Sequence, residues 1–548
     1  MAVNTQKSTS KKGTWRSWIR GRLSGRTIIH RLGLLGFLLL VFSPLLVLVA
    51  GFTRSILHQD TAYLSLMLPS ERRLGLLFNS LGLAIGVAVS GVLVGFLAAG
   101  MLWRWRRAPG AWLRWCFLLL VPIPPYAHAI AWDSLLVPLN AFLQRSGFSA
   151  IPFQGWIGTW WVQLMAWLPV AVGLALVGLE SVEMRMIEAA RMLRSDRTIL
   201  FRIVIPIAAP ILVASGGFLF LLSLMDYSIP SYFGLNVYAL EIFAEFSASN
   251  EPLHTFVLSL PMLLVTVLLI SISQQGFRNA DQTPAASRKV WVMRPSLPLW
   301  LRTLQRLALG MLIGQGVVLV VSLAAAAGSL TNILAVSVSA GREISNTFWI
   351  ALGAALLSLP FAFAAANELV NNERYARLWW FLVTIPLALP PPLVGVGLIA
   401  IWNRPVFAGV YGSLLMPILA SAARFASLAV VIMTTQLRRI DPLLVDAARL
   451  IETKPRHTTL LIRLPLLVPG LASAACISFA LSLGELGATL MVVPAGMSSL
   501  TIRIYNYLHY GATSEVAGLC LLMSLLALIS ASLAWLAMFG WRKLVLCD

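Results

Sequence analysis

The sequence predicts an all-α polytopic membrane protein, with about twelve transmembrane helices in two parallel six-helix repeats. Three observations support this fold class. Of the 548 residues, 59% are hydrophobic and only 11% are charged, whereas about a quarter of the residues in soluble domains are charged. Apolar runs of about twenty residues, enough to cross a hydrocarbon core of about 30 Å, recur along the chain. One polar sequence pattern also occurs twice, between apolar runs of each half.

The apolar runs form two sets of six. Because backbone polar groups in lipid must be satisfied within the segment, each run is predicted to be a helix. The spans predicted for the first half are 33–52, 74–102, 112–137, 156–180, 208–233 and 254–275. Those predicted for the second half are 304–327, 345–369, 377–402, 411–436, 467–494 and 515–541. The domains predicted from these spans are a basic cytosolic tail (1–32), a first membrane half (33–275), a cytosolic linker (276–302), a second membrane half (303–541) and a short cytosolic tail (542–548).

The distribution of basic residues predicts the orientation of the spans. The loop 103–111 carries three arginines, whereas the loop 235–254 on the opposite side carries three glutamates and no Lys or Arg. By the positive-inside rule, both termini are expected in the cytosol. The same bias explains the net charge of +20. No basic stretch has the pattern of a nucleic-acid reader, so no nucleic-acid partner is expected.

The cysteines and histidines predict neither a disulfide framework nor a metal site. The four cysteines have no paired spacing, and the six histidines are dispersed. We therefore expect no metal ligands and no catalytic residues in this chain.

The repeated polar pattern predicts a contact with a partner on the cytosolic side. An acid, two alanines and an arginine are followed, at nearly the same separation in both copies, by an isoleucine and a proline. The residues are Glu188, Ala189, Ala190, Arg191, Ile203 and Pro206 in the first copy, and Asp446, Ala447, Ala448, Arg449, Ile462, Leu464 and Pro465 in the second. The acid is expected near a helix start, where the helix dipole favours it. The alanines would let another surface approach closely, and the proline would end the helix.

Two acids and two asparagines also recur in corresponding places. Asp226 and Glu485 follow the prolines of the two copies at the same distance. Ionisable groups within spans are costly and usually face the bundle interior or a wet cavity, so both are candidates for the translocation pathway, with a structural cap as the alternative. Asn79 and Asn346 open the second span of each half. Helix capping is the simpler explanation for them, and a place in the pathway is the alternative.

Proline clusters mark the third span of each half and are expected to kink it. They are Pro122, Pro124 and Pro125, and Pro390, Pro391 and Pro392. Because each half has six spans, both halves keep the same direction, which predicts a parallel repeat about an axis along the membrane normal.

The repeated pattern resembles the coupling-loop signature of binding-protein-dependent ABC importer permeases, Glu-Ala-Ala followed by Ile-x-(Leu/Ile)-Pro. The resemblance covers nearly the whole chain, because span number, topology and paired loops all fit. Two fused six-span halves are similar to the ferric-iron and thiamine permease group, and the segments 226–234 and 484–489 resemble its iron-type members. Two positions depart from the family pattern, since its loop glycine is replaced by Arg194 and Glu452. A turn with positive φ would cost more with these side chains, so the loop bend is expected to differ while docking survives.

The resemblance implies a transport subunit that is not itself an enzyme. Its partners would be a cytosolic ABC ATPase dimer, with one loop in each ATPase subunit, and an external or periplasmic solute-binding protein, within the lipid of a bacterial inner (cytoplasmic) membrane. The chain has no G-x-x-x-x-G-K-(S/T) motif, so ATP–Mg is expected on the partner and no cofactor in this chain. The resemblance implies ferric iron as the solute, with thiamine or another small charged solute as the alternative.

Two other classes of membrane protein are alternatives to this interpretation. A twelve-span secondary transporter shares the span number and the parallel halves, but its early cytosolic loop usually carries a Gly-Asp-Arg-Gly type motif that residues 103–107 lack. A membrane enzyme would show clustered histidines or paired carboxylates at one face, and the sequence shows neither.

Overall fold

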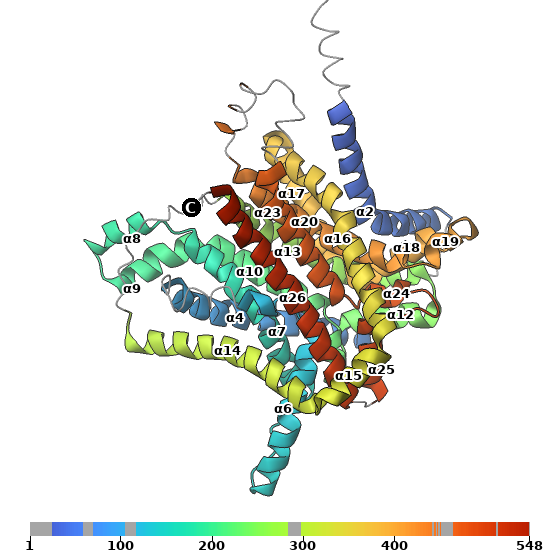
Figure 1. The fold of residues 1–548 in the computed structure, drawn as a ribbon, viewed down its shortest axis with the longest axis horizontal. Helices are drawn as coiled ribbons and strands as arrows, with labels where there is room; N and C mark the ends of the chain where they lie inside the picture. Colours follow the sequence, from blue (N-terminus) through green and yellow to red (C-terminus); the bar gives the residue numbers. More distant parts are fainter. Residues whose placement is uncertain are drawn as a thin grey trace, which may run out of the picture.

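The protein is helical throughout the described chain. The computed structural model describes residues 25–58, 70–104, 117–282, 297–440, 443–444, 447, 450, 464–510 and 513–546. Over these residues no strand is present (Figure 1). The predicted all-α class is confirmed.

The first half contains six principal helices and several short ones. The principal helices are α2 (Gly25–Leu57), α4 (Glu71–Arg104), α6 (Pro125–Arg145), α7 (Gly155–Glu180), α10 (Ile205–Met225) and α13 (Pro252–Gln282). The short ones are η1 (Phe117–Leu120), α8 (Met184–Arg191), α9 (Asp196–Ile199), η2 (Leu200–Val204), α11 (Ser228–Tyr232) and α12 (Tyr238–Ser249).

The second half repeats this order. Its longer helices are α14 (Leu299–Ala327), α15 (Leu330–Ser339), α16 (Gly341–Asn371), α17 (Ala376–Thr384), α18 (Pro391–Trp402), α20 (Leu415–Arg438), α23 (Leu464–Leu483), α25 (Leu500–Tyr510) and α26 (Thr513–Leu546). The short ones are η3 (Glu373–Tyr375), η4 (Ile385–Ala388), η5 (Pro405–Phe407), α19 (Ala408–Tyr411) and α24 (Thr489–Val492).

The proline clusters break the third span of each half. Among the described residues, 10 helices are long and apolar enough to cross a membrane, or 11 if the bent pair 376–388 and 391–402 is one span. The pair is bent by 96° at Pro390. The predicted span 112–137 is not one helix where it is described, because η1 ends at Leu120 and α6 begins at Pro125. Proline lacks an N–H and clashes with the preceding turn, so the predicted kinks are complete breaks.

The two halves pack their helices in the same way. In the first half α4, α7 and α10 contact one another and α13 lies beside α10. In the second half α16, α20 and α23 do the same, and α26 lies beside α23 (Figure 1). The duplicated sequence has therefore produced a duplicated helix arrangement, as predicted.

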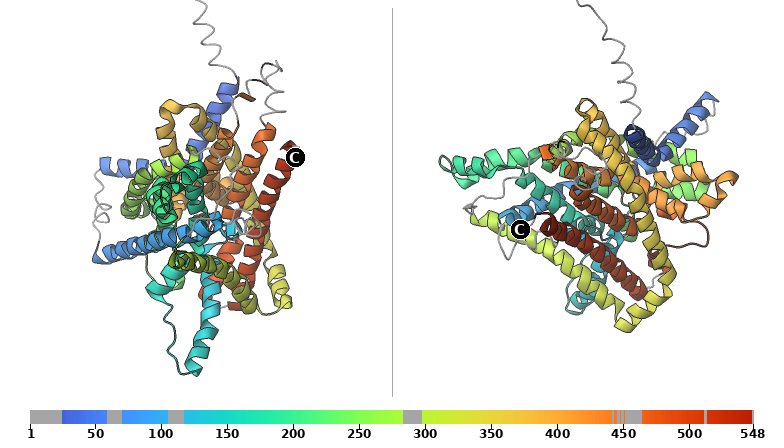
Figure 2. Two further views of the ribbon diagram at one scale, coloured as in Figure 1. Left: turned by 90° about the vertical axis from the view of Figure 1, so that its left-hand side faces the viewer. Right: turned by 45° about the horizontal axis from the view of Figure 1, so that its top comes forward.

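The first helix of each half packs on the other half. α2 contacts α16 and α18, and α14 contacts α4 and α6 (Figures 1 and 2). The approach of α18 to α2 depends on Gly397, where a Cβ would lie 2.4 Å from the carbonyl oxygen of Pro44. The halves are therefore joined by two long helix contacts, one made by α2 and the other by α14.

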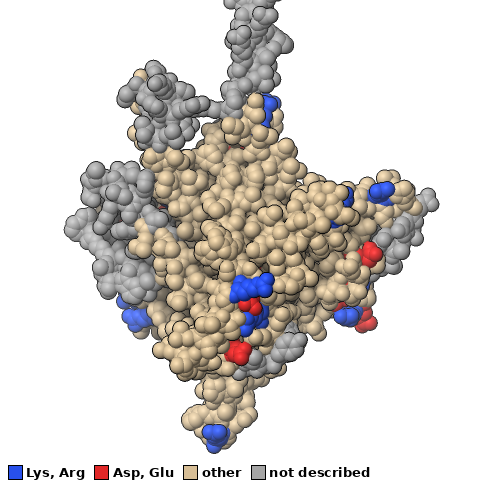
Figure 3. Space-filling view, turned by 45° about the vertical axis from the view of Figure 1, so that its right-hand side comes forward, with Lys and Arg blue, Asp and Glu red and all other residues tan. Residues whose placement is uncertain are grey.

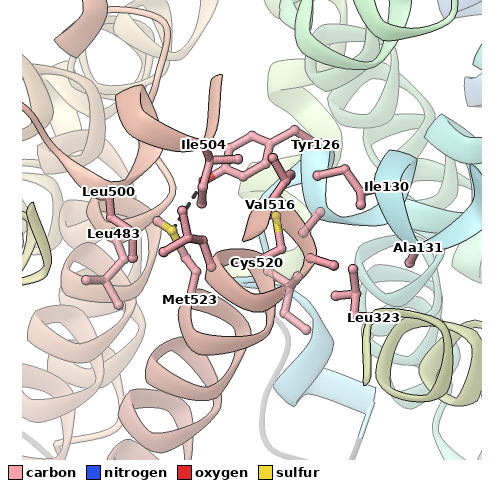
Figure 4. Packing of buried hydrophobic residues seen from close by; sticks show 14 of the residues in the cluster. Tyr126, Ile130, Ala131, Leu323, Leu483, Leu500, Ile504, Val516, Cys520 and Met523 are labelled. Atoms are coloured by element: carbon pink, nitrogen blue, oxygen red, sulfur yellow. Dashed lines mark hydrogen bonds between the residues drawn. The ribbon is translucent and has the colours of Figure 1, made fainter. Parts of the chain in front are cut away.

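A buried core also crosses from one half to the other. Ile130 of α6 lies in one apolar cluster with Leu323 of α14 and Cys520 of α26 (Figure 4). Within this cluster the hydroxyl of Tyr126 donates a hydrogen bond of 3.3 Å to Sδ of Met523. The halves therefore share their interior.

The outer surface suits a hydrocarbon solvent. Large apolar side chains on the long helices are exposed, among them Leu93, Leu264 and Ile272. Figure 3 shows one face on which Lys, Arg, Asp and Glu form only a few small groups. Because exposed apolar area of this extent is unfavourable in water, these helix faces are assigned to lipid.

Candidate coupling and translocation sites

The first repeated segment forms a short helix and a turn that extend from the helix bundle (Figure 1). On α8, Ile187 is buried while Glu188 and Ala189 are exposed. The next turn carries Met192 and Leu193, which are 85% and 82% exposed. The segment thus presents small and apolar side chains outward while one isoleucine anchors it.

Two expectations about this segment are wrong in detail. α8 begins at Met184 and has no acid in its first turn, so Glu188 lies in the second turn and the helix dipole does not explain its position. Pro206 does not end the loop helix either, because helical structure continues from Asp196 through η2 into α10. η2 is a π-helical turn, a feature that accommodates an irregularity in the i→i−4 ladder such as the missing proline N–H.

The turn between α8 and α9 forms without a glycine. The N–H of Arg194 donates to the carbonyl of Ala190 at 2.9 Å. Among the described residues, Asn250 is the only non-glycine residue with positive φ, so Arg194 takes an ordinary backbone conformation. Nε of Arg191 lies 2.8 Å from Oδ1 of Asp196, and this ion pair joins the two sides of the turn. The family glycine is therefore not needed for this bend.

The second repeated segment lies mostly outside the described residues. Asp446, Ala448, Arg449, Ile462 and also Glu452 are not described. Ala447 is exposed and helical, and Leu464 and Pro465 begin α23. The role predicted for this copy stays a prediction.

Asp226 lies directly after α10 in a network of neutral donors. Its Oδ1 accepts hydrogen bonds from the N–H and the hydroxyl of Ser228, at 3.0 and 2.6 Å. Its Oδ2 accepts from Nε2 of Gln163 on α7 at 3.0 Å. The carboxylate therefore closes the turn from α10 into α11.

Glu485 takes the corresponding place in the second half but has a charged partner. Its side chain is fully buried and pairs with Arg424 of α20. Its carboxylate also accepts from the backbone N–H groups of Ala488 and Thr489, at 2.9 and 2.8 Å. It thereby satisfies donors at the start of α24.

Asn79 and Asn346 do not cap helices. α4 begins at Glu71 and α16 at Gly341, so both asparagines lie inside their helices. Nδ2 of Asn79 donates to the carbonyl of Asn236 at 3.3 Å, and Nδ2 of Asn346 donates to that of Ser498 at 2.9 Å. Both therefore hold the chain that follows the acid of their half.

The residue after each asparagine makes a second matching contact. The N–H of Tyr238 donates to the hydroxyl of Ser80 at 2.7 Å, and the N–H of Leu500 donates to that of Thr347 at 2.8 Å. Each half thus has an equivalent two-point clamp, defined as Asn79 with Ser80 and Asn346 with Thr347.

The acid turns of the two halves lie close to each other. Tyr227, next to Asp226, belongs to one buried cluster with Ala388 of the second half. In addition, a Cβ on Gly484 would lie 2.7 Å from Cγ of Pro124 in the first half. The turns that hold Asp226 and Glu485 therefore both lie at the seam between the halves.

Arg424 and Gln163 were not singled out from the sequence as partners of the two acids. Arg424 could have been found, since it is a charged residue inside the predicted span 411–436. Gln163 is neutral and gives no comparable signal.

A family comparison agrees with this duplicated geometry. The chain matches the model of the binding-protein-dependent transport system inner membrane component twice, over residues 91–283 and 358–544. The chain belongs to this family. Each match contains one repeated segment and one of the two acids, so the protein is a permease with two fused halves.

Curated relatives of the permease are also transport permeases. The molybdenum transport system permease protein ModB of Haemophilus influenzae is 32% identical over 229 residues, which cover 39% of this chain and 96% of the relative. The putative 2-aminoethylphosphonate transport system permease protein PhnV of Salmonella typhimurium is 26% identical over 182 residues, 33% of this chain and 67% of the relative. The putrescine transport system permease protein PotI of Escherichia coli is 24% identical over 184 residues, 33% of this chain and 66% of the relative. No solved structure gives a significant match.

Proposed function

We propose that the permease is the membrane subunit of an ATP-driven importer and that a separate cytosolic ABC ATPase dimer grips its two repeated segments. The observation that carries this proposal is the exposed tip at Met192 and Leu193, which stands on a segment present twice in the sequence. The ATPase would bind ATP with Mg²⁺ and hydrolyse it, and this chain would supply only the moving pathway.

The packing beneath the tip supports the transmission of movement. Ile187 of α8 and Ile199 of α9 belong to one buried cluster with Leu102 of α4, Leu179 of α7 and Leu309 of α14. Because packed interiors transmit displacement rather than absorb it, a pull on α8 and α9 would move the ends of three long helices.

The duplicated halves support alternating access. Rocking of one half against the other would open the seam near Asp226 and Glu485 to each side in turn, as in transporters built from repeats. An external solute-binding protein would deliver the solute on the side opposite to the repeated segments, and both termini would face the cytosol.

The solute proposed from the resemblance of residues 484–489 to iron-type permeases is ferric iron, and thiamine is the alternative in that group. The three relatives are named for molybdenum, 2-aminoethylphosphonate and putrescine, so they do not favour iron. A small charged solute is common to all of these candidates. Uptake into vesicles that hold the complete complex should therefore be measured with ferric iron, thiamine, molybdate, 2-aminoethylphosphonate and putrescine.

Purification of the permease with its native partners tests the coupling. A dimeric ATPase should co-purify with the wild type and be released by Glu188→Lys combined with Asp446→Lys. Glu71→Lys combined with Glu251→Lys, an equal charge change at two exposed residues of the opposite side, is the matched control and should retain the ATPase. Retention of ATPase and uptake by the double variant would overturn the assignment. Uptake that a protonophore abolishes and that is indifferent to ATP would instead indicate a secondary transporter.

A further inference from the structure

A groove runs along one face of α14 where this helix crosses α6 and α7. It has a volume of about 410 Å³, and its lining includes Trp132 of α6, Trp161 of α7, and Gly310 and Gly314 of α14. The two indole rings lie edge to face with centroids 5.5 Å apart. Nε1 of Trp132 donates to Oε1 of Gln315 at 2.8 Å, which fixes this wall of the groove.

The groove is open to the side that faces lipid. A Cβ on Gly310 or Gly314 would meet no atom within 4 Å. Leu307, which also lines the groove, is 62% exposed. An occupant can therefore enter from the bilayer and lie directly against the backbone of α14.

Three arginines gather at one end of the groove. Arg306 lines it, and Arg104 of α4 donates to Oε1 of Gln305, the preceding residue. Arg302 and Arg306 are both close enough to Arg104 to repel its charge. Within the described part of the chain none of the three forms an ion pair. Among the residues that the structure describes, this end of the groove thus holds positive charge without an ion-pair partner.

We propose that this groove binds an anionic phospholipid, with its phosphate at Arg302, Arg306 and Arg104 and an acyl chain along Gly310 and Gly314. Charge complementarity selects the lipid, because a zwitterionic head group would leave the arginines unbalanced. Basic pockets between transmembrane helices bind such head groups, and an apolar slot flanked by tryptophans suits a chain near the membrane interface. The other face of α14 carries Leu309 and Leu312, which share a buried cluster with Ile187 of α8, so the lipid would brace the helix on which the coupling segment rests.

Native mass spectrometry of the purified full-length permease, equilibrated with phosphatidylglycerol or phosphatidylcholine, tests this proposal. The wild type should retain phosphatidylglycerol and not phosphatidylcholine. Arg302→Gln with Arg306→Gln should weaken retention of phosphatidylglycerol by about 25-fold, since each basic residue near an anionic surface contributes about fivefold. Gly314→Leu, which fills the slot and keeps all charges, should abolish retention of phosphatidylglycerol.

Two control variants separate a defined site from general attraction. Arg374→Gln with Arg377→Gln removes the same charge from η3 and the first turn of α17, and Gly75→Leu adds the same side chain at another open glycine. Both should retain the lipid as the wild type does. Equal loss of lipid from the two arginine variants would overturn the proposal, and so would retention of lipid by Gly314→Leu. It would also be overturned if the Arg302 and Arg306 variant kept its lipid but lost a co-purified ATPase.

Discussion

Arg424 of α20 forms an ion pair with Glu485, whose side chain is fully buried. At the corresponding place in the first half, the described donors to Asp226 are all neutral and belong to Gln163 and Ser228. The duplicated turns therefore share a shape but differ in charge.

This difference predicts unequal responses to neutralisation. Glu485→Gln leaves Arg424 without its counter-charge, and removing one partner of a buried pair costs about 3–5 kcal/mol, with a lower value expected here because Arg424 is partly exposed. Asp226→Asn keeps an acceptor for Ser228, so the melting temperature of this variant should fall less than that of Glu485→Gln. Arg424→Gln combined with Glu485→Gln should recover part of the loss. Thermal unfolding in detergent measures these changes, and equal shifts for Glu485→Gln and Asp226→Asn would contradict the prediction.

Both acid substitutions should also reduce transport while leaving ATPase binding intact, because the two turns lie at the seam between the halves. Uptake by vesicles and co-purification of the ATPase measure the two effects separately. Unchanged uptake in a folded variant would show that the substituted acid acts only as a structural cap.

The clamp of Asn346 and Thr347 should hold α25 in place. Thr347→Val leaves the buried N–H of Leu500 without its acceptor, a loss of about 1–3 kcal/mol. Ser358→Ala on the same helix is the matched control, because that hydroxyl donates its hydrogen bond to the carbonyl of Ala354 within α16. Hydrogen exchange over residues 498–502 should rise in Thr347→Val and stay unchanged in Ser358→Ala. The prediction fails if both variants exchange alike.

The ion pair of Arg191 and Asp196 should keep the α8–α9 turn ready for docking. Arg191→Asp should lower ATP-dependent uptake by loosening this turn, because two negatively charged carboxylates would then face each other. Asp196→Arg in the same chain restores an opposite-charge pair and should recover part of the activity. A double variant no better than the single one would show that the pair does not shape the turn.

Close contact at Gly484 should make this residue intolerant of a side chain. A Cβ there would lie 2.7 Å from Cγ of Pro124, so Gly484→Ala should push the halves apart and lower both stability and uptake. Gly518→Ala is the control, because no atom lies within 4 Å of its added Cβ and alanine favours a helix by about 1 kcal/mol. Wild-type uptake and melting temperature in Gly484→Ala would refute this contact.

The sequence was sufficient for the fold because hydrophobic length and loop charge are local signals. Span composition predicted α7 (Gly155–Glu180) within a residue or two of its ends, and the duplication predicted equivalent positions for Asp226 and Glu485. The coupling segment was located correctly, but the helix start at Met184 and the continuation through Pro206 depend on packing around Ile187 and on a π-helical turn, which the pattern does not encode.

Contacts between elements far apart in the chain could not be predicted. The interpretation of Asn79 and Asn346 as caps used only neighbouring residues, whereas their acceptors lie at Asn236 and Ser498. The third spans were expected to bend at their prolines, but how far they bend depends on what packs against them. The groove at Gly310 and Gly314 likewise exists only because α14 crosses helices of the other half.

The crossing of α2 onto α16 and α18 has a consequence for biosynthesis. The ribosome completes α2 long before it begins the helices on which α2 will rest, so newly made α2 must remain in the bilayer with its docking face against lipid. The amino-terminal repeat cannot reach its final structure until the carboxy-terminal repeat has emerged, and maturation is therefore a single late event rather than two independent ones.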